Sequence, residues 1–325
     1  MKQHAIWIDI LKGVAIILVV VGHNATQNIT DFIFCFHMPL FFLLSGFTFS
    51  PKPIKQYIHK STKRLLVPYI FFFVVISLPQ LWTMYIEKNV LGGARLMLSM
   101  VYGGSILTGI YSVFWFITVL WLATNIFNIA VNHKIKLWIL PLLIVCGYLC
   151  EYVQFPMPWN INVVPMALTY IWIGFLLNKI ISYEFLNKKK NMVYTLIISI
   201  AMLFSIFLLR HQLTIDMKYC RFGIPVISLI SSILASIAIA IIAMTISSNV
   251  AVSKILGDVG RASMVIMYVH QPIKFMILEP NGLSGNNTMT IIVCLVISLS
   301  IYILLRQHVI LRKCFLGQYD CATRN

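Results

Sequence analysis

Ten runs of apolar residues, each near the length of a membrane-spanning helix, are the feature that most limits how this chain can fold. A helix needs roughly 20 apolar residues to cross the hydrocarbon core of a bilayer. The runs lie at Ala5–Gly22, Phe32–Phe49, Leu66–Ile86, Val113–Val131, Leu137–Phe155, Val163–Ile181, Val193–Leu209, Pro225–Ser247, Ser263–Leu278 and Thr288–Leu305. Only 10% of the residues are charged, against about 25% in soluble domains. The sequence therefore predicts an all-α polytopic membrane protein with about ten transmembrane helices.

The segments between these runs leave little room for a soluble domain. The longest loop runs from Glu87 to Ser112, and its glycine-rich part from Leu91 to Gly109 is predicted to be an interfacial or re-entrant segment. The first helix follows a start without a small-residue cleavage site, so we expect it to be retained. We divide the chain into a transmembrane domain, residues 1–306, and a short cytoplasmic tail, residues 307–325.

The placement of positive charge predicts the orientation. Cytoplasmic ends of membrane helices collect Lys and Arg, and ten helices with both termini in the cytoplasm put most of the 25 cations there. The exceptions are Lys88, Arg95, Arg210, Lys218, Arg221 and Lys274, which leaves nineteen of 25 on the cytoplasmic side. We interpret the net charge of +16 as an orientation signal with affinity for anionic lipid, and expect no nucleic-acid partner.

Two histidines in the first two predicted helices are the leading candidates for catalysis. An imidazole in or near hydrocarbon is costly, which marks His23 and His37 as functional candidates. The second helix runs back inward, so the two residues start at similar depth, and Pro39 can kink that helix. A neutral imidazole near pH 7 can take a proton from a hydroxyl. The alternative for His23 alone is an imidazole facing lipid headgroups.

Asp9 and Lys12 precede His23 on one side of the same predicted helix. Asp9 lies about 40° around the helix from His23 and roughly 21 Å along it, toward the cytoplasm. We expect Asp9 to be a catalytic residue and Lys12 to bind a cofactor or co-substrate. The alternative is an ion pair of Asp9 with Lys12 at the helix end.

A cluster of cations precedes the third predicted helix. Lys60, Lys63 and Arg64 lie at i, i+3 and i+4 at the membrane mouth. Such a cluster could bind a phosphate-bearing ligand, and the alternative is that these residues only orient the helix.

Further candidates for substrate binding lie later in the chain. Trp115 lies at the start of an aromatic-rich span, where it could form part of a pocket wall or part of an interfacial aromatic belt. Glu151 lies near an outer helix end, and His270 is roughly 10 Å into the ninth helix with Lys274 one turn later. Arg210, His211, Asp216, Lys218 and Arg221 form a polar outer loop that could meet a hydrophilic acceptor or simply be solvated. The two histidines have no third metal ligand at a suitable spacing, and the seven cysteines show no metal-ligand spacing. No metal site is therefore expected.

Several of these residues fall in blocks whose order resembles the membrane-bound acyltransferase-3 family, and within it the branch described as fucose 4-O-acetylase-like. The resemblance covers nearly the whole chain. The blocks are Asp9-Ile10-Leu11-Lys12-Gly13, Val21-Gly22-His23, Phe36-His37-Met38-Pro39-Leu40-Phe41-Phe42, Ser45-Gly46, Lys63-Arg64-Leu65-Leu66-Val67-Pro68-Tyr69, Trp115-Phe116, and Ser263-Met264 to Tyr268 with His270.

The resemblance implies transfer of an acyl group from cytoplasmic acyl-CoA to a hydroxyl, usually on a sugar. It matches the family's essential first-helix histidine to His23, and we expect His37 to orient the acceptor or share the proton. The family's R-x-x-R pair matches imperfectly, because Ser61 stands three residues before Arg64 and the pair Lys60-x-x-Lys63 is offset by one. Acetyl-CoA is expected as co-substrate, with no permanently bound cofactor.

The expected function is therefore O-acetylation of a cell-surface polysaccharide or its lipid-linked precursor, as in O-antigen biosynthesis, in a bacterial inner membrane. A transporter or flippase of a lipid-linked saccharide would also have ten helices and polar groups within the membrane. A non-catalytic membrane component of a sensor or synthesis complex is a second alternative. Acetylation by the purified protein separates both from an enzyme.

Overall fold

The protein is an all-α polytopic membrane protein, as predicted. The computed structural model describes residues 6–153, 155–180 and 189–319, and among these it contains helices and loops with one isolated β-bridge, between Asp216 and Arg221. The cations Lys2, Lys188 and Arg324 lie outside the described residues.

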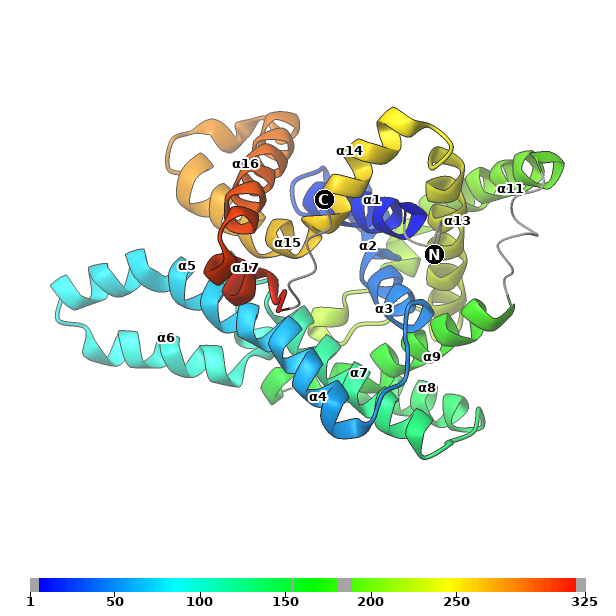
Figure 1. Ribbon diagram of the computed structural model, residues 1–325, viewed down its shortest axis with the longest axis horizontal. Helices are drawn as coiled ribbons and strands as arrows, with labels where there is room; N and C mark the ends of the chain where they lie inside the picture. Colours follow the sequence, from blue (N-terminus) through cyan, green and yellow to red (C-terminus); the bar gives the residue numbers. More distant parts are fainter. Residues whose placement is uncertain (1–5, 154, 181–188, 320–325) are drawn as a thin grey trace.

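The helices follow one another in a bundle (Figure 1). The first nine are α1 (Ile6–Gly22), α2 (Gln27–Phe34), α3 (His37–Phe47), α4 (Ile54–Ser61), α5 (Val67–Ile86), α6 (Val90–Tyr102), α7 (Trp115–Asn132), α8 (Ile139–Leu149) and α9 (Val164–Ile180). They are followed by α11 (Lys189–Leu208), α12 (Arg210–Leu213), α13 (Ile227–Ile246), α14 (Val250–Arg261), α15 (Ser263–Pro272), α16 (Asn287–Gln307) and α17 (Val309–Leu316).

Each of the ten predicted spans overlaps at least one helix, but only six helical segments in the described part of the chain are long and apolar enough to cross a membrane. These are Gln27–Phe47, Ile54–Ile86, Gly109–Asn132, Pro158–Ile180, Ile227–Ile246 and Asn287–Gln307. The helix α1 has 17 residues, and the segments Ile139–Tyr152, Val193–Leu208 and Ser263–Leu278 are also short. The count of ten therefore stays a prediction.

The second predicted span is two helices, not one. The helix α2 ends at Phe34, Phe36 leaves the helical region with φ −148°, and α3 begins at His37. Pro39 lies in the first turn of α3, where its missing N–H costs nothing, whereas a continuous helix would lose a hydrogen bond there. The break places His37 at the start of a helix.

The segment from Leu91 to Gly109 forms α6 followed by two short 3₁₀ turns. The 13-residue α6 contains no buried residue. It runs back along α5, and the two helices extend together away from the bundle (Figure 1). This segment is therefore a short outer helix of a hairpin, and the predicted interfacial or re-entrant position stays a prediction.

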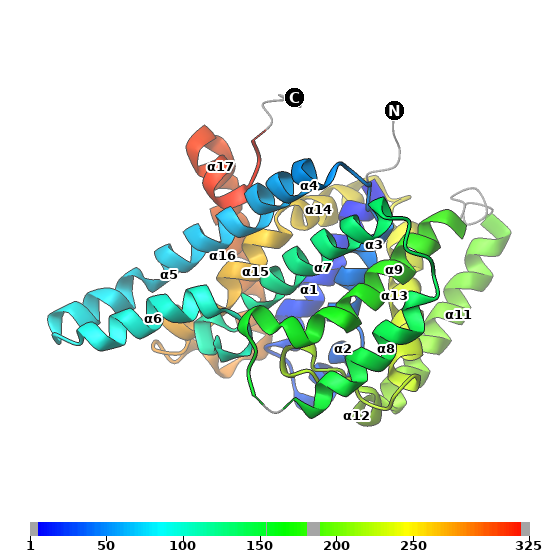
Figure 2. The same ribbon diagram turned by 90° about the horizontal axis from the view of Figure 1, so that it is seen from below.

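Two sides of the molecule can be distinguished from the helix ends. Figure 2 shows α4, α14 and α17 along one side and α12 at the opposite side. The predicted tail contains α17, which packs on α5 where the ring of Phe315 meets those of Phe71 and Phe72. The side of α4, α14 and α17 carries cations that the charge pattern assigns to the cytoplasm, and we refer to it below as the cytoplasmic side.

Glycines allow α1 to lie directly against α14. A Cβ at Gly260 would overlap the backbone oxygen of Asp9, and a Cβ at Gly13 would overlap that of Leu256. Small residues commonly permit such close backbone contact between membrane helices. The contact places the end of α14 beside the start of α1, and α15 then continues toward the other end of α1.

We expect Gly260→Ala to destabilise the protein by about 1–3 kcal/mol, because the added methyl group must separate the two backbones. The matched control is Gly257→Ala on the same helix, whose Cβ would meet only the guanidinium of Arg261 at 3.5 Å. Alanine there should be neutral or stabilising by up to about 1 kcal/mol. Unfolding of the detergent-solubilised variants would measure both changes, and equal stability of the two variants would contradict the packing argument.

Candidate active site

A cavity of about 530 Å³ lies between α1, α3, α7, α15 and the loop that follows α12. Its wall on α1 extends from Lys12 to His23, a distance of roughly 16 Å at 1.5 Å per residue. Most of the wall between these ends is apolar, with Ile16, Phe41 and Phe116 among its residues. The cavity therefore joins the region of Lys12, near the start of α1, to the histidines near the other end of that helix.

The structure brings His23 and His37 to this one cavity. His23 follows the last residue of α1 and is partly exposed, whereas His37 is buried and its Nδ1 lies 3.1 Å from the Ile33 oxygen. The Phe34 ring contacts both imidazoles, with centroid distances of 5.9 Å to His23 and 4.6 Å to His37. The two histidines therefore share a cavity, with an aromatic ring in contact with both.

The imidazole nearest to His23 comes from α15. The ring centroids of His23 and His270 are 5.4 Å apart. His270 is fully buried and is not part of the cavity wall, and it contacts the ring of His23, which is part of that wall. One turn later, Lys274 donates a hydrogen bond from Nζ to the His23 carbonyl oxygen at 3.1 Å. His270 of α15 and Lys274 of the following π-helical segment, Ile273–Leu278, thus both contact His23 at the end of α1.

A second cavity, of about 250 Å³, opens near α4 on the cytoplasmic side. Lys52, Tyr57 and Lys60 line it, together with several hydroxyl side chains. Five residues line both cavities, namely Ser45, Thr48, Arg64, Leu65 and Leu120. The two cavities are therefore adjacent, and Arg64 lies at their junction. Arg64 belongs to a π-helical turn, Thr62–Leu66, before α5.

Three of the predicted site residues make contacts outside these cavities. Asp9 lies 3.4 Å from the Lys12 ammonium and 3.8 Å from the guanidinium of Arg261, as an ion-paired residue of the α1–α14 contact. The Lys63 ammonium lies over the Tyr319 ring, 4.8 Å from its centroid. Glu151 accepts a hydrogen bond from the Phe222 backbone N–H at 2.6 Å. The remaining predicted residue, Trp115, lines the larger cavity.

The outer loop contributes a lysine that sequence reasoning treated only as part of a polar loop. Lys218 lines the larger cavity and donates a hydrogen bond to the Leu107 oxygen at 2.6 Å. Burial lowers the pKa of Lys218 to about 8, and the carboxylate of Asp216 acts in the opposite direction. At neutral pH the ammonium is therefore mostly charged and adds positive charge to the cavity.

Gln271 is a second cavity residue that the sequence did not single out. It is 4% exposed and lines the cavity, and its Oε1 has no hydrogen-bond partner within the described structure. A buried amide oxygen without a partner is costly unless a ligand satisfies it. The position directly after His270 was the only signal for Gln271 in the sequence.

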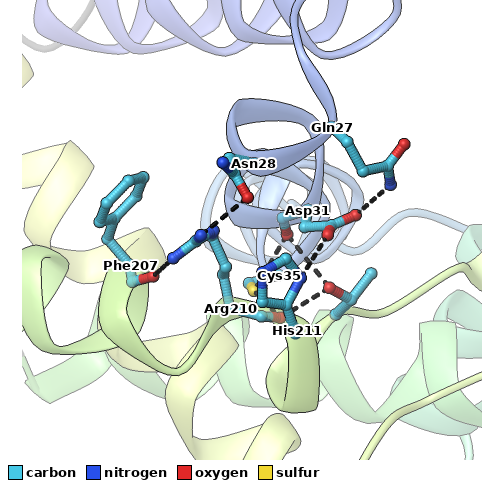
Figure 3. A network of polar contacts seen from close by, with 8 residues as sticks. Gln27, Asn28, Asp31, Cys35, Phe207, Arg210 and His211 are labelled. Atoms are coloured by element: carbon cyan, nitrogen blue, oxygen red, sulfur yellow. Dashed lines mark hydrogen bonds and ion pairs between the residues drawn. The ribbon is translucent and has the colours of Figure 1, made fainter.

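Arg210 and His211 of the polar outer loop belong to a network that joins α12 to α2 (Figure 3). His211 Nδ1 lies 2.7 Å from the Asp31 carboxylate, and Arg210 donates a hydrogen bond to Asn28 at 2.7 Å. None of these four residues lines the cavity, so the network links two helices outside it. Among the described residues, no group of three His, Cys, Asp or Glu side chains could hold a metal ion.

Comparison with known proteins adds one finding. A family model described as an acyltransferase domain matches residues 5–306. All residues that line the two cavities lie within this range. No curated protein and no solved structure matches the chain.

Proposed function

The chain belongs to the membrane acyltransferase-3 family, and we propose that it is an O-acetyltransferase that uses acetyl-CoA from the cytoplasm. The proposed acceptor is a sugar hydroxyl of a cell-surface polysaccharide or of its lipid-linked precursor, and the proposed location is a bacterial inner membrane. The observation that carries the proposal is the pair of adjacent cavities, which joins cations on the cytoplasmic side to His23 near the opposite side.

The cytoplasmic cavity suits the phosphates of the donor. Lys60 and Arg64 are exposed at its rim, and Lys12 lines the adjoining cavity. Guanidinium and ammonium groups form charge-assisted hydrogen bonds with phosphate oxygens. With the phosphates held there, the pantetheine arm would extend through the apolar part of the larger cavity and place the thioester beside His23.

The proposed chemistry needs one base near the thioester. The acceptor oxygen attacks the carbonyl carbon while His23 takes the hydroxyl proton. The C–S bond then breaks, and the leaving thiolate takes the proton from the His23 imidazolium, which yields the ester and free CoA. Lys218 and Lys274 place positive charge near the oxygen that becomes negative in this step.

The other residues of the cavity would hold the substrates. We propose that His37 orients the acceptor or shares its proton, and that Trp115 forms part of the wall around the sugar. The unpaired Gln271 oxygen would accept a hydrogen bond from a sugar hydroxyl or a pantetheine amide. Asp9 would act indirectly, by fixing the Lys12 ammonium at the cytoplasmic end.

The test is acetyl transfer by the purified protein in liposomes. The assay supplies acetyl-CoA outside the vesicles and short oligosaccharides as acceptors, and measures free thiol and acetylated product by mass spectrometry. Acetylated product together with free CoA supports the proposal. Transport of the saccharide without thioester cleavage would contradict it and favour a transporter.

We expect Arg64→Gln to raise the KM for acetyl-CoA by about tenfold or more, because hydrogen bonds to charged groups contribute about 1.5–3 kcal/mol. The kcat should change little, since the cation contacts the donor equally in the ground and transition states. Lys55→Gln is the matched control, because Lys55 is exposed on α4 and lines neither cavity. An unchanged KM in Arg64→Gln would place the phosphates elsewhere.

A further inference from the structure

His270 is a fully buried histidine in which one ring nitrogen has a hydrogen-bond partner and the other has none within the described structure. Its Nδ1 lies 2.9 Å from the Ile266 carbonyl oxygen, one helical turn earlier on α15. Its Nε2 is buried and has no hydrogen-bond partner within the described structure. A buried polar atom without a partner is uncommon in native proteins, and one beside a candidate base calls for a functional explanation.

The bond to Ile266 decides the tautomer of His270. A carbonyl oxygen only accepts hydrogen bonds, so Nδ1 must carry the proton. In the neutral ring Nε2 is then an acceptor with a free lone pair. His270 can therefore accept one hydrogen bond at Nε2, and its surroundings must supply an N–H or O–H group.

A ring that contacts His270 and can supply this proton is the imidazole of His23. The two ring centroids are 5.4 Å apart with an angle of 30° between the planes. At this centroid separation two imidazoles can form one N–H···N hydrogen bond when a nitrogen of each ring faces the other. Lys274, in the π-helical segment Ile273–Leu278 that continues α15, donates a hydrogen bond to the His23 carbonyl oxygen, so the backbone of His23 is held beside His270.

We infer that His270 is a positioning residue for His23, because its unprotonated Nε2 accepts the N–H of His23 and so leaves the other His23 nitrogen free to act as base. The inference rests on the proposed function, in which His23 removes the acceptor proton. It differs from the expectation that His270 contacts substrate, since His270 is fully buried and does not line the cavity. Histidines that act as bases are commonly held in one tautomer by such a neighbour.

The proton balance of the step is simple. The cavity-facing nitrogen of His23 takes the hydroxyl proton, and the ring becomes an imidazolium that still donates its other N–H to His270. When the thiolate leaves, it takes back the proton that the cavity-facing nitrogen received. His270 keeps its single proton on Nδ1 throughout, and no proton passes to it.

Two substitutions test the contributions of the two ring nitrogens of His270 separately. In His270→Asn the side-chain amide can still donate to the Ile266 oxygen from the place of Nδ1, but nothing replaces Nε2. In His270→Gln the longer amide can present an oxygen near the place of Nε2. We expect His270→Asn to lower kcat by about 10- to 100-fold, as for other residues that orient a catalytic ligand, with KM for acetyl-CoA unchanged. His270→Gln should retain kcat to within a few-fold.

A second measurement does not depend on turnover. NMR of the ¹⁵N-histidine-labelled full chain in liposomes reports the tautomer of each imidazole, and the His23→Gln variant identifies the His23 signals. His23 should be a single tautomer in the wild type and a mixture in His270→Asn. This result decides the role of His270 even if the wild-type protein transfers no acyl group.

The outcomes are distinct. Wild-type kcat in His270→Asn, or the same His23 tautomer with and without His270, overturns the inference while the proposed function stands. Equal loss of kcat in the Asn and Gln variants, with unchanged tautomers, assigns His270 a structural role and also overturns it. Absence of acetyl transfer by the wild-type protein contradicts the proposed function instead.

Discussion

Replacing His23 by alanine is expected to lower kcat for acetyl transfer by about 10²- to 10⁴-fold, the usual contribution of a positioned general base. The reason is that His23 is the partly exposed imidazole of the cavity, located where the donor thioester and an acceptor from the outer side would meet. Binding of acetyl-CoA should be retained, because the proposed phosphate contacts lie at the other end of the cavity. Single-turnover transfer and calorimetric titration with acetyl-CoA measure the two effects separately.

The control for this substitution is His133→Ala. His133 is exposed after the last residue of α7 and lines neither cavity, so its loss should leave kcat within about twofold. Thermal unfolding of both variants shows whether a loss of activity comes from unfolding. If folded His23→Ala transfers acetyl at the wild-type rate, His23 is not the base, and the mechanism fails although the family assignment remains.

Blocking the junction between the two cavities should have a comparably large effect. Ser45 lines both cavities, and its hydroxyl donates a hydrogen bond to the Phe41 oxygen at 2.8 Å within α3. An indole at this position would enter the space through which the pantetheine arm must extend. We expect Ser45→Trp to lower transfer by about 100-fold or more, since even small misplacement of reacting groups has effects of this size.

A graded series makes this prediction sharper. Activity should fall from Ser45→Ala through Ser45→Leu to Ser45→Trp as the side chain grows, while acetyl-CoA still binds at the cytoplasmic cavity. Val75→Trp is the matched control, because Val75 is 47% exposed on α5 and lines neither cavity. Full activity of Ser45→Trp would mean that the donor reaches His23 by another route.

The sequence predicted where the helices lie better than how they are divided. The length and apolarity of the runs locate all ten predicted spans on helices, because burial in hydrocarbon requires long apolar segments with internally paired backbones. The break between α2 and α3 was harder to place. Pro39 indicated a kink, but the helix interruption falls at Cys35 and Phe36, three to four residues earlier.

The site was predictable only in part. Depth along the helices follows from counting residues, and this was enough to place His23 and His37 at one level and Lys12 at another. Counting residues on separate helices does not reveal which side chains lie between them. The Phe34 ring between the histidines and the positions of Lys218 and Gln271 in the cavity wall therefore needed the structure.

The sequence by itself determined the class of the protein, the approximate helices and the bias of charge, and it predicted His23 as the leading candidate base. Only the tertiary structure decided that α15 packs on α1 and brings the ring of His270 into contact with that of His23. The physical reason is that helices in lipid associate through packing and polar contacts between their faces, not through apolarity, which all of them share. The partner of α1 depends on the match of Gly13 with Gly260, residues far apart in the chain whose complementarity no single apolar run contains.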